Sequence, residues 1–455
     1  AKFKFPCNFS LLDSLMNFDF VALKQMLAPL QSCQSVVVGF SGGMDSTVLL
    51  YSLHQLQTKG EVTFSIRALH VNHNLQADAD NWQEICEKTC AKLGIELYCE
   101  KVQISETGES TSASENKARA VRYKVFEEQI KVNETLLLAH HLDDQLETML
   151  FRLNRGSSVK GLSAVPQSRV FGKGFIFRPL LKFDRLALTR FAEEHELWWV
   201  EDLSNQALEF DRNYIRNKIL PAIEFRWPSY RLSWSKSLQL IVEASEMLDE
   251  LADLDLENLE FNESTSISIK HLQLLSSYRQ RNSIRRWLEK IDLPEIGWNR
   301  LHNFVEEFIV ADKKSESTFS IEGSSFACYQ NFLHLLPALD APGKGIVWQA
   351  NRNRQVKLVN NGKLLLKELP SGGIAPSCLE KVEVRFRQGG ESCHLSRRPK
   401  KSLKKVLQEC RIEPWLRDRV PLLYQDEELV CIPGIGIGEG SEVKSGEPGF
   451  EVIWQ

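Results

Sequence analysis

Hydrophobic positions in the first third of the chain follow two different periods. Short runs of apolar, often β-branched residues occur at positions 35–40, 63–71, 96–101 and 135–139. Each run is followed by a stretch in which apolar residues recur every three or four positions, at 46–56, 77–93, 114–130 and 143–154. The first pattern is typical of buried strands and the second of amphipathic helices. The alternation predicts an α/β domain with a parallel sheet covered by helices on both faces.

Two glycines mark where predicted helices end. Gly94 directly follows the second helical stretch, and Gly156 lies two residues after the fourth. A helix commonly ends on a residue with left-handed backbone, and glycine adopts that conformation without a steric penalty. We therefore expect both glycines to have positive φ angles.

The pattern changes after Pro221. Residues 230–308 read as helices, and from Phe319 onward the chain reads as short strands and turns. Asn361-Gly362 between two apolar runs predicts a hairpin. The sequence thus predicts an α/β domain, a helical middle domain, a linker with a hairpin, and a small α+β domain, with these bounds in order: 1–225, 226–340, 341–380 and 381–455.

Composition is that of an ordinary globular protein. Of the 455 residues, 43% are hydrophobic and 25% are charged. No apolar run approaches the roughly 20 residues that a membrane helix needs, and the N-terminal segment lacks a signal-peptide core. The ten cysteines form no CxxC pair and no zinc-finger spacing. These features predict reduced thiols and a cytoplasmic location, with Cys86 and Cys90 packed inside a helix.

Positive charge is concentrated near the C-terminus. Residues 381–420 carry twelve Lys and Arg against five acids, a net charge of +7, whereas the whole chain carries −4. Such a patch is typical of contact with an RNA backbone, although an ordinary solvated face is the alternative. The densest part predicts tRNA contacts by Arg397, Arg398, Lys400, Lys401, Lys404 and Lys405.

The motif SGGMDS, Ser41–Ser46, lies between the first predicted strand and its helix. Gly42 and Gly43 let the backbone approach a phosphate closely, and the start of the helix favours an anion. Ser41 and Ser46 add hydroxyl groups. Asp45 beside bound phosphates would repel them unless a cation lies between, which favours Mg²⁺. The loop matches neither a Walker A motif nor a dinucleotide fingerprint.

Further polar motifs follow in order. His70 begins HVNHNL, and Arg119 lies in ARAVRY with Arg122 three residues on. HHLDDQLET, at 140–148, places Asp144 and Glu147 on one face of a helix's first turn, where they could cap the helix or bind an ammonium group. DRNYIRNKILP, at 211–221, carries Arg212 and Arg216. Taken alone, His70 fits a satisfied loop histidine.

SGGMDS resembles the PP-loop of the N-type ATP pyrophosphatases, and the motifs in this order resemble the tRNA(Ile)-lysidine synthetase family. The resemblance covers the first 225 residues well, the middle loosely, and the last 75 residues again, including Trp415–Leu423. One departure is Asn74, where the family is expected to favour glycine; asparagine tolerates left-handed backbone.

The resemblance implies an ATP- and Mg²⁺-dependent ligase. Its substrates would be L-lysine and the isoleucine tRNA with a CAU anticodon, whose wobble cytidine is adenylated and then joined to lysine. It implies nucleotide contacts by Ser41–Ser46 and His70, Mg²⁺ at Asp45, and charge stabilisation on the α-phosphate by Arg216. Lysine would bind at Asp144, Glu147 and Arg119. A homodimer would be unsurprising for the family.

Three alternatives stay open at this stage. A PP-loop tRNA cytidine thiolase would share the loop, but such enzymes often use clustered cysteines. A small-molecule ligase of the NAD or GMP synthetase kind would share it too, without needing a basic C-terminal patch. A non-catalytic RNA-binding protein would have no need of an intact SGGMDS.

Overall fold

The computed structural model describes residues 17–72, 79–102, 111–201, 206–257, 265–310, 318–321 and 323–455, apart from the side chains of 111–116 and 310. The second histidine of HVNHNL, His73, and the departure at Asn74 lie outside these residues. The chain divides into two compact units, Ala1–Glu250 and Leu251–Gln455. The division falls within one long helix, α10 (Tyr230–Glu257), rather than at an exposed linker.

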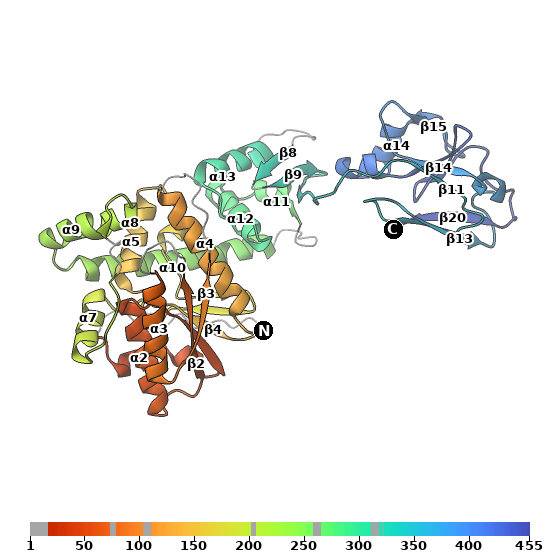
Figure 1. Ribbon diagram of the computed structural model, residues 1–455. Helices are drawn as coiled ribbons and strands as arrows, with labels where there is room; N and C mark the ends of the chain where they lie inside the picture. Colours follow the sequence, from red (N-terminus) through yellow and green to blue (C-terminus); the bar gives the residue numbers. More distant parts are fainter. Residues whose placement is uncertain are drawn as a thin grey trace. The chain divides into compact units, whose positions relative to one another are not determined.

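The first unit contains six strands and the helices around them (Figure 1). The strands are β1 (Ser35–Gly39), β2 (Ser65–Asn72), β3 (Glu96–Lys101), β4 (Thr135–Leu137), β5 (Ser168–Phe171) and β6 (Gly174–Phe177). The helices are α1 (Phe20–Met26), η1 (Ala28–Leu30), α2 (Met44–Thr58), α3 (Ala79–Leu93), α4 (Thr111–Gln129), α5 (Leu142–Leu153), α6 (Val159–Leu162), α7 (Arg185–Glu194), α8 (Asp211–Tyr214), η3 (Ile215–Ile219), α9 (Leu220–Arg226) and most of α10.

The sheet has the order β3-β2-β1-β4-β6-β5. Strands β1 to β4 and β6 pair in parallel, which confirms the parallel sheet expected from the sequence. Strand β5 pairs antiparallel with β6 and forms an edge that the sequence analysis did not predict. The two strands have four residues each and turn at Gly172, whose φ is +52°. Runs this short carry too little periodicity to be recognised.

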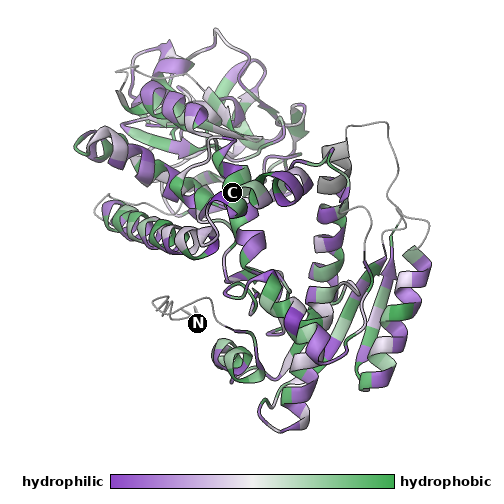
Figure 2. Ribbon diagram, turned by 90° about the vertical axis from the view of Figure 1, so that its left-hand side faces the viewer, coloured by the Kyte–Doolittle hydropathy of each residue, from purple (hydrophilic) through white to green (hydrophobic). Residues whose placement is uncertain are grey.

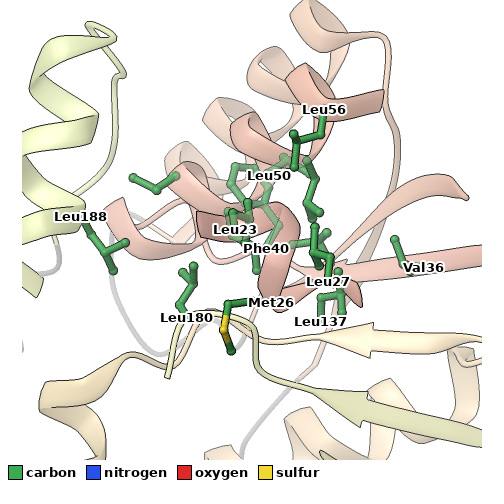
Figure 3. Close-up of a cluster of buried hydrophobic side chains, with 14 of the residues drawn as sticks. Leu23, Met26, Leu27, Val36, Phe40, Leu50, Leu56, Leu137, Leu180 and Leu188 are labelled. Carbon is green, nitrogen blue, oxygen red and sulfur yellow. The ribbon is translucent and has the colours of Figure 1, made fainter. Parts of the chain in front are cut away.

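Alternate residues of the central strand enter two separate cores. Val36 and Val38 face one core with side chains of α1, α2 and α7, and Val37 faces the other with Phe126 and Ile130. Figure 3 shows the first core, where Leu23, Leu50 and Leu188 from three helices converge on the sheet. Because successive strand residues point to opposite faces, an apolar run such as SVVVGF must be covered on both sides. This confirms helices on both faces.

The glycines expected at helix ends have the expected backbone. Gly94 has a φ of +66° and Gly156 a φ of +69°. Cys86 and Cys90 on α3 are both buried, as expected for thiols inside a helix packed on the sheet. No helix within the described residues is both long and apolar enough to cross a membrane.

The second unit begins with helices and continues as antiparallel sheets. Its helices are α11 (Ile269–Gln273), α12 (Ser277–Lys290), α13 (Trp298–Val305), η4 (Glu306–Val310), η5 (Pro376–Leu379), α14 (Leu403–Glu409) and η6 (Pro414–Arg419). Its strands are β7 (Ser266–Ser268), β8 (Thr318–Ile321), β9 (Ser324–Tyr329), β10 (Phe332–Leu335), β11 (Ile346–Trp348), β12 (Gln355–Lys357), β13 (Lys363–Leu369), β14 (Val382–Arg385), β15 (Ser392–Cys393), β16 (Lys401–Ser402), β17 (Leu422–Gln425), β18 (Glu428–Ile432), β19 (Gly436–Ile437) and β20 (Gly449–Trp454).

The helical middle region also carries a small sheet. Strands β7, β10, β9 and β8 form four antiparallel neighbours that pack on α12 and α13 around Trp287 and Phe304. Strand β7 has three residues and was not expected from the sequence. The helical character of the region is confirmed, but its core is completed by strands. Helices and strands of the chain carry both hydrophobic and hydrophilic residues (Figure 2).

The C-terminal part is the expected small α+β domain. The predicted hairpin exists: β12 pairs antiparallel with β13, and β13 pairs with β20. Its turn is wider than the two residues expected, because Leu358 donates a backbone hydrogen bond to Gly362. Asn360 and Gly362 have the positive φ angles of this turn, at +54° and +73°.

One buried ion pair ties the sheet together and generates a stability prediction. Arg67 on β2 donates to Glu134, with 2.8 Å between Nε and Oε1, and the glutamate side chain is 1% exposed. Replacing Arg67 by Ala leaves that carboxylate buried without its cation, so we expect the free energy of unfolding to fall by about 3 kcal/mol. Denaturant unfolding measures this change.

The control uses an exposed pair of the same unit. Lys24 and Glu61 lie 2.9 Å apart with half of the lysine side chain exposed, so Lys24→Ala should leave the stability nearly unchanged. Equal losses in the two variants would contradict a special role for the buried pair.

Candidate active site

The loop Ser41–Ser46 forms a compact turn between β1 and α2. Ser46 donates through Oγ to the Gly43 carbonyl at 2.9 Å, and its Oγ lies 3.1 Å from that of Ser41. Gly42 has a φ of +78°, and a Cβ there would lie 2.9 Å from the sulfur of Cys86. Glycine is therefore required at this position both by its backbone and by the helix packed behind it.

The start of α2 offers an anion site. Gly43 is the N-cap residue and provides no side-chain cap, so the first amides of this fifteen-residue helix have no capping acceptor. Such amides, with the positive end of the helix dipole, favour a bound phosphate. Ser41 is exposed and can add its hydroxyl. Ser46, by contrast, is buried and its hydroxyl is already engaged within the loop, so its main contribution is to hold the turn.

Asp45 lies in the first turn of α2 and faces the end of the sheet. One carboxylate oxygen, Oδ1, is buried and has no hydrogen-bond partner, while Oδ2 lies 3.7 Å from His141 Nε2. Burial raises the pKa of this carboxyl group. A buried oxygen without a partner carries a free-energy cost. That oxygen is suited to accept a ligand that the protein itself does not supply.

Acidic side chains gather at the start of α5. Asp143, Asp144 and Glu147 follow one another in its first two turns, and His141 is the N-cap residue. Asp144 accepts the His141 amide at 3.0 Å, so part of the capping expected as the simpler alternative is present. Asp143 accepts from Arg231 and from the Arg185 amide, both at 2.8 Å. Asp143 is therefore satisfied by structural partners, and Asp144 and Glu147 remain for the site.

His141 is surrounded by three carboxylates. Its Nε2 lies 3.5 Å from Asp144 Oδ2 as well as 3.7 Å from Asp45 Oδ2, and its Nδ1 lies 3.7 Å from Asp143 Oδ2. Burial alone would lower the pKa of the imidazole, but the charges of Asp144 and Asp45 outweigh it and raise the pKa. The sequence analysis did not select this residue. The sequence feature that could have identified it is the pair His140-His141, which directly precedes the acidic first turn of α5.

Arg216 occupies the acidic pair. Its Nε and Nη2 bind the two oxygens of Glu147 at 2.6 and 2.8 Å, and Nη2 also lies 3.2 Å from Asp144 Oδ1. Burial lowers the pKa of the guanidinium, but the hydrogen bonds and charge of Glu147 outweigh burial and raise it. The two sets of residues that the sequence analysis assigned to different substrates are therefore in direct contact.

A π-helical turn presents Arg216. The segment Ile215–Ile219, η3, is π-helical between α8 and α9, and it packs through Ile215 on Leu142 and Leu146 of α5. One extra residue per turn widens a helix locally, and such turns are frequent at functional sites. Arg212 on α8 turns toward the same place, with its guanidinium 5.9 Å from the Phe151 ring centre.

These groups line a cavity of about 130 Å³. Its walls include Arg119, Asp144, Glu147, Arg212 and Arg216, which the sequence analysis had singled out from three separate motifs. The remaining lining residues are His140, Thr148, Val165 and Asn213. Arg119 keeps its guanidinium over the Tyr123 ring, 4.9 Å from the ring centre. The cavity has room for a few water molecules or for the aminoalkyl end of an amino acid.

His70 supports the loop from behind. It is buried, and its Nδ1 lies 2.9 Å from the carbonyl oxygen of Phe40, the residue before Ser41. Burial lowers the pKa of its imidazole. These contacts match the satisfied histidine considered from the sequence, and a direct contact of His70 with the nucleotide stays a prediction.

Three family models match the chain in order. A PP-loop domain matches residues 18–223, a TilS substrate binding domain matches 267–334, and a TilS substrate C-terminal domain matches 382–454.

Curated relatives match nearly the full length. The tRNA(Ile)-lysidine synthase of Coxiella burnetii is 37% identical over 436 residues, which is 94% of this chain and 95% of that protein. That of Pseudomonas aeruginosa is 37% identical over 429 residues, covering 91% and 92%. The chain belongs to the tRNA(Ile)-lysidine synthase family. The family expected from the motifs is thus confirmed, together with a PP-loop domain of the ATP-binding kind.

A solved structure is also similar to this member of the lysidine synthase family. The U34-tRNA thiolase NcsA from Methanococcus maripaludis shares 20% sequence identity and covers 49% of this chain and 78% of that chain, with a TM-score of 0.39.

The six basic residues expected to contact tRNA differ in accessibility. Arg397, Arg398, Lys400, Lys404 and Lys405 are exposed, whereas Lys401 is half-buried and binds Glu409 at 2.8 Å. Two other basic residues of the patch, Arg417 and Arg419, are buried and donate to backbone carbonyls, the first to Ile412 at 3.0 Å. The accessible positive charge is therefore smaller than the sequence count, and it is concentrated at 397–405.

His140 generates a prediction about acid sensitivity. Burial, together with the nearby Arg178 guanidinium, lowers its pKa from about 6.5 to about 3. Arg178 Nε donates to His140 Nδ1 at 3.3 Å, a bond that needs the neutral ring. Between about pH 6.5 and pH 3, His140 is therefore protonated in the unfolded chain but neutral in the folded chain. The difference in proton binding at His140 lowers the free energy of unfolding as the pH falls toward 3, by up to about 1.4 kcal/mol per pH unit.

Replacing His140 by Asn removes this contribution to the pH dependence of stability. We expect the unfolding free energy of His140→Asn to fall less steeply than that of the unchanged protein between pH 6.5 and 4, as measured by denaturant titrations. His54→Asn, at a half-buried helix position, serves as the control. A slope in His140→Asn equal to that of the unchanged protein would contradict the assignment.

Proposed function

We propose that this chain joins L-lysine to C2 of the wobble cytidine in isoleucine tRNA with a CAU anticodon. The change would alter codon recognition from AUG to AUA and tRNA identity from methionine to isoleucine. The observation that carries the proposal is the cavity in which two carboxylates and three arginines lie together. Membership of the tRNA(Ile)-lysidine synthase family supports the same substrates. The reaction would take place in the cytoplasm, where tRNA is modified.

The chemistry proceeds in two displacements. The C2 oxygen of cytidine attacks the α-phosphorus of ATP, and the bond from that phosphorus to the bridging oxygen breaks, releasing pyrophosphate. The ε-nitrogen of lysine then attacks C2, the C2–oxygen bond breaks, and AMP leaves with that oxygen. The lysine nitrogen gives up its protons in this step. Amides at the start of α2 would stabilise the leaving pyrophosphate.

Mg²⁺ fits at Asp45, although the protein supplies only part of its ligands. The partnerless Oδ1 of Asp45 is the kind of oxygen that Mg²⁺ prefers. Within the described residues, no group of three or more His, Cys, Asp or Glu side chains is placed to hold a metal ion. Magnesium sites that work with nucleotides usually take one or two carboxylates and complete the shell with phosphate oxygens and water. When bound there, the ion would neutralise charge on the phosphates.

The acidic pair fits a protonated lysine side chain. Asp144 and Glu147 face the cavity with two negative charges, and Arg216 neutralises about one of them. An ammonium group could bind beside Arg216 and restore balance, and a carboxylate could then accept its proton. Arg119 of α4, which lines the same cavity, could bind the α-carboxylate of lysine or a phosphate bidentately.

The C-terminal basic residues would contact tRNA away from the anticodon. Methionine tRNA bears the same CAU anticodon, so the anticodon alone cannot distinguish the two tRNAs. The exposed cations at 397–405 are suited to backbone phosphates, and such contacts weaken as salt increases.

The decisive test is incorporation of labelled lysine into isoleucine tRNA with Mg·ATP. We expect label in the tRNA that depends on ATP, and no label when the wobble cytidine is replaced by another base. If no label appears but AMP is still released in the presence of tRNA, the proposed nucleophile is wrong.

A sulfur-transferring reaction is the second candidate that such a result would favour. Cys90 and Cys99 do not support it, because burial raises the pKa of Cys90 to about 12 and that of Cys99 to about 11. Thiolates, not thiols, act as nucleophiles and metal ligands.

The contact of Arg216 with Glu147 predicts that two substitutions at one position differ. Glu147→Gln removes the charge but keeps an oxygen for the arginine, so lysine KM should rise about 10- to 100-fold while adenylate formation is largely kept. Glu147→Ala also releases Arg216, so both steps should fall. Single-turnover formation of adenylated tRNA, followed by lysine addition, separates the two steps.

Asp45→Asn provides the matched comparison on the phosphate side. It should lower adenylate formation by about 100-fold or more while leaving lysine addition to preformed adenylated tRNA nearly intact. If Glu147→Gln and Asp45→Asn lowered both steps equally, the assignment of roles would be wrong.

A further inference from the structure

Two large aromatic side chains project into solvent at the end of α9. Phe225 is 90% exposed and Trp227 is 60% exposed, and Arg226 lies between them in the chain. The guanidinium carbon of Arg226 lies 5.8 Å from the centre of the Trp227 ring. Exposing two aromatic rings within three residues loses the stabilisation that burial would bring. A function for the exposed rings would explain their retention.

The turn that carries these rings is firmly attached to the active site. Ile223 of α9 packs against a hydrophobic cluster that includes Leu142 and Leu146 of α5, the helix that bears Asp144 and Glu147. Tyr230, just after the turn, is buried in the same cluster and its amide bonds to the Trp227 carbonyl at 2.9 Å. Figure 1 shows α9 next to α8 and α5.

An ion pair adds a second attachment. Arg231 donates to Asp143 at 2.8 Å and also binds Glu224, so it links the turn to the first residues of α5. The rings are thus held at a constant position relative to the catalytic cavity, even though they are exposed. A rigid aromatic surface loses little conformational entropy when a ligand stacks on it.

The local charge points to a polyanion. Residues 212–231 contain five Lys or Arg and one acid. Arg216 and Arg231 are ion-paired with carboxylates, whereas Lys218 and Arg226 are exposed. Aromatic rings interleaved with arginines are the chemistry with which proteins bind single-stranded nucleic acid, because every base has a face that can stack. A protein partner would instead be expected to bury a larger apolar patch.

We propose that Phe225, Arg226 and Trp227 form a stacking platform for the anticodon bases beside the wobble cytidine. The inference rests on the proposed function, since the neighbouring bases lose their stacking partner only when the wobble base is drawn out of the anticodon stack toward the active site. The two aromatic rings replace the stacking that the neighbouring anticodon bases lose. Arg226 binds the backbone phosphate beside them. The platform thereby helps to direct the wobble base toward Arg216 and Asp45.

The test uses the full chain and tRNA whose middle anticodon adenine is replaced by 2-aminopurine, a base whose fluorescence falls on stacking. We expect this fluorescence to be quenched on binding to the unchanged protein and to stay higher with Trp227→Leu or Phe225→Leu. The KM for tRNA should rise between about fivefold and a hundredfold in these variants. The KM for lysine should stay within about twofold.

Conservative variants separate the effect of aromatic stacking from the effect of side-chain size. Trp227→Phe keeps an aromatic face and should retain most of the quenching, whereas Trp227→Leu should not. Tyr98→Leu, at another exposed ring of the same unit, should change neither value. Because both platform rings are exposed, thermal unfolding should be unaffected.

Two results would overturn the proposal in distinguishable ways. Normal lysine incorporation, with quenching and tRNA KM unchanged in the leucine variants, would remove the platform but keep the proposed function. A changed oligomeric state in those variants, without a change in quenching, would assign the rings to a protein contact instead. Failure of the unchanged protein to incorporate lysine would overturn both proposals.

Discussion

The pairing of Arg216 with Glu147 and Asp144 is the interaction on which the site depends. Arg216 and the two carboxylates lie in one small cavity, and burial of each charge is compensated by the opposite charge beside it. The pairing also connects the end of the sheet, through α5, to the π-helical turn η3. A ligand with an ammonium group must therefore enter a balanced cluster rather than an empty acidic pocket.

That balance changes how the two half-reactions relate to each other. The sequence assigned Arg216 to the phosphate and the carboxylates to lysine, as if the two sites were independent. In the structure, His141 lies between Asp45 and Asp144, within 3.7 Å and 3.5 Å of their oxygens. The proposed nucleotide and lysine sites thus share charged neighbours. Substitutions that delete a side chain should couple the two steps, and isosteric ones should separate them.

The scaffold supports this cluster with buried polar pairs, one far from the cavity and one next to it. Arg67 with Glu134 joins the starts of β2 and β4, at the opposite edge of the sheet, and Arg231 with Asp143 fixes the first turn of α5 beside the cavity. Such pairs contribute less to net stability than apolar packing would, but removing one partner leaves an uncompensated charge. They hold the element ends in one arrangement, which a site made of several helix and strand termini requires.

The sequence by itself determined the local elements and the chemical types. The apolar runs that became β1 to β4, the left-handed glycines and the SGGMDS loop all depend on neighbours along the chain, and the motifs indicated the family. Only the tertiary structure decided which charges meet. Glu147 and Arg216 are 69 positions apart, and no periodicity relates them. For the same reason the sequence did not predict the burial of Arg417 and Arg419 or the antiparallel strand β5. Burial and strand pairing depend on the path of the whole chain.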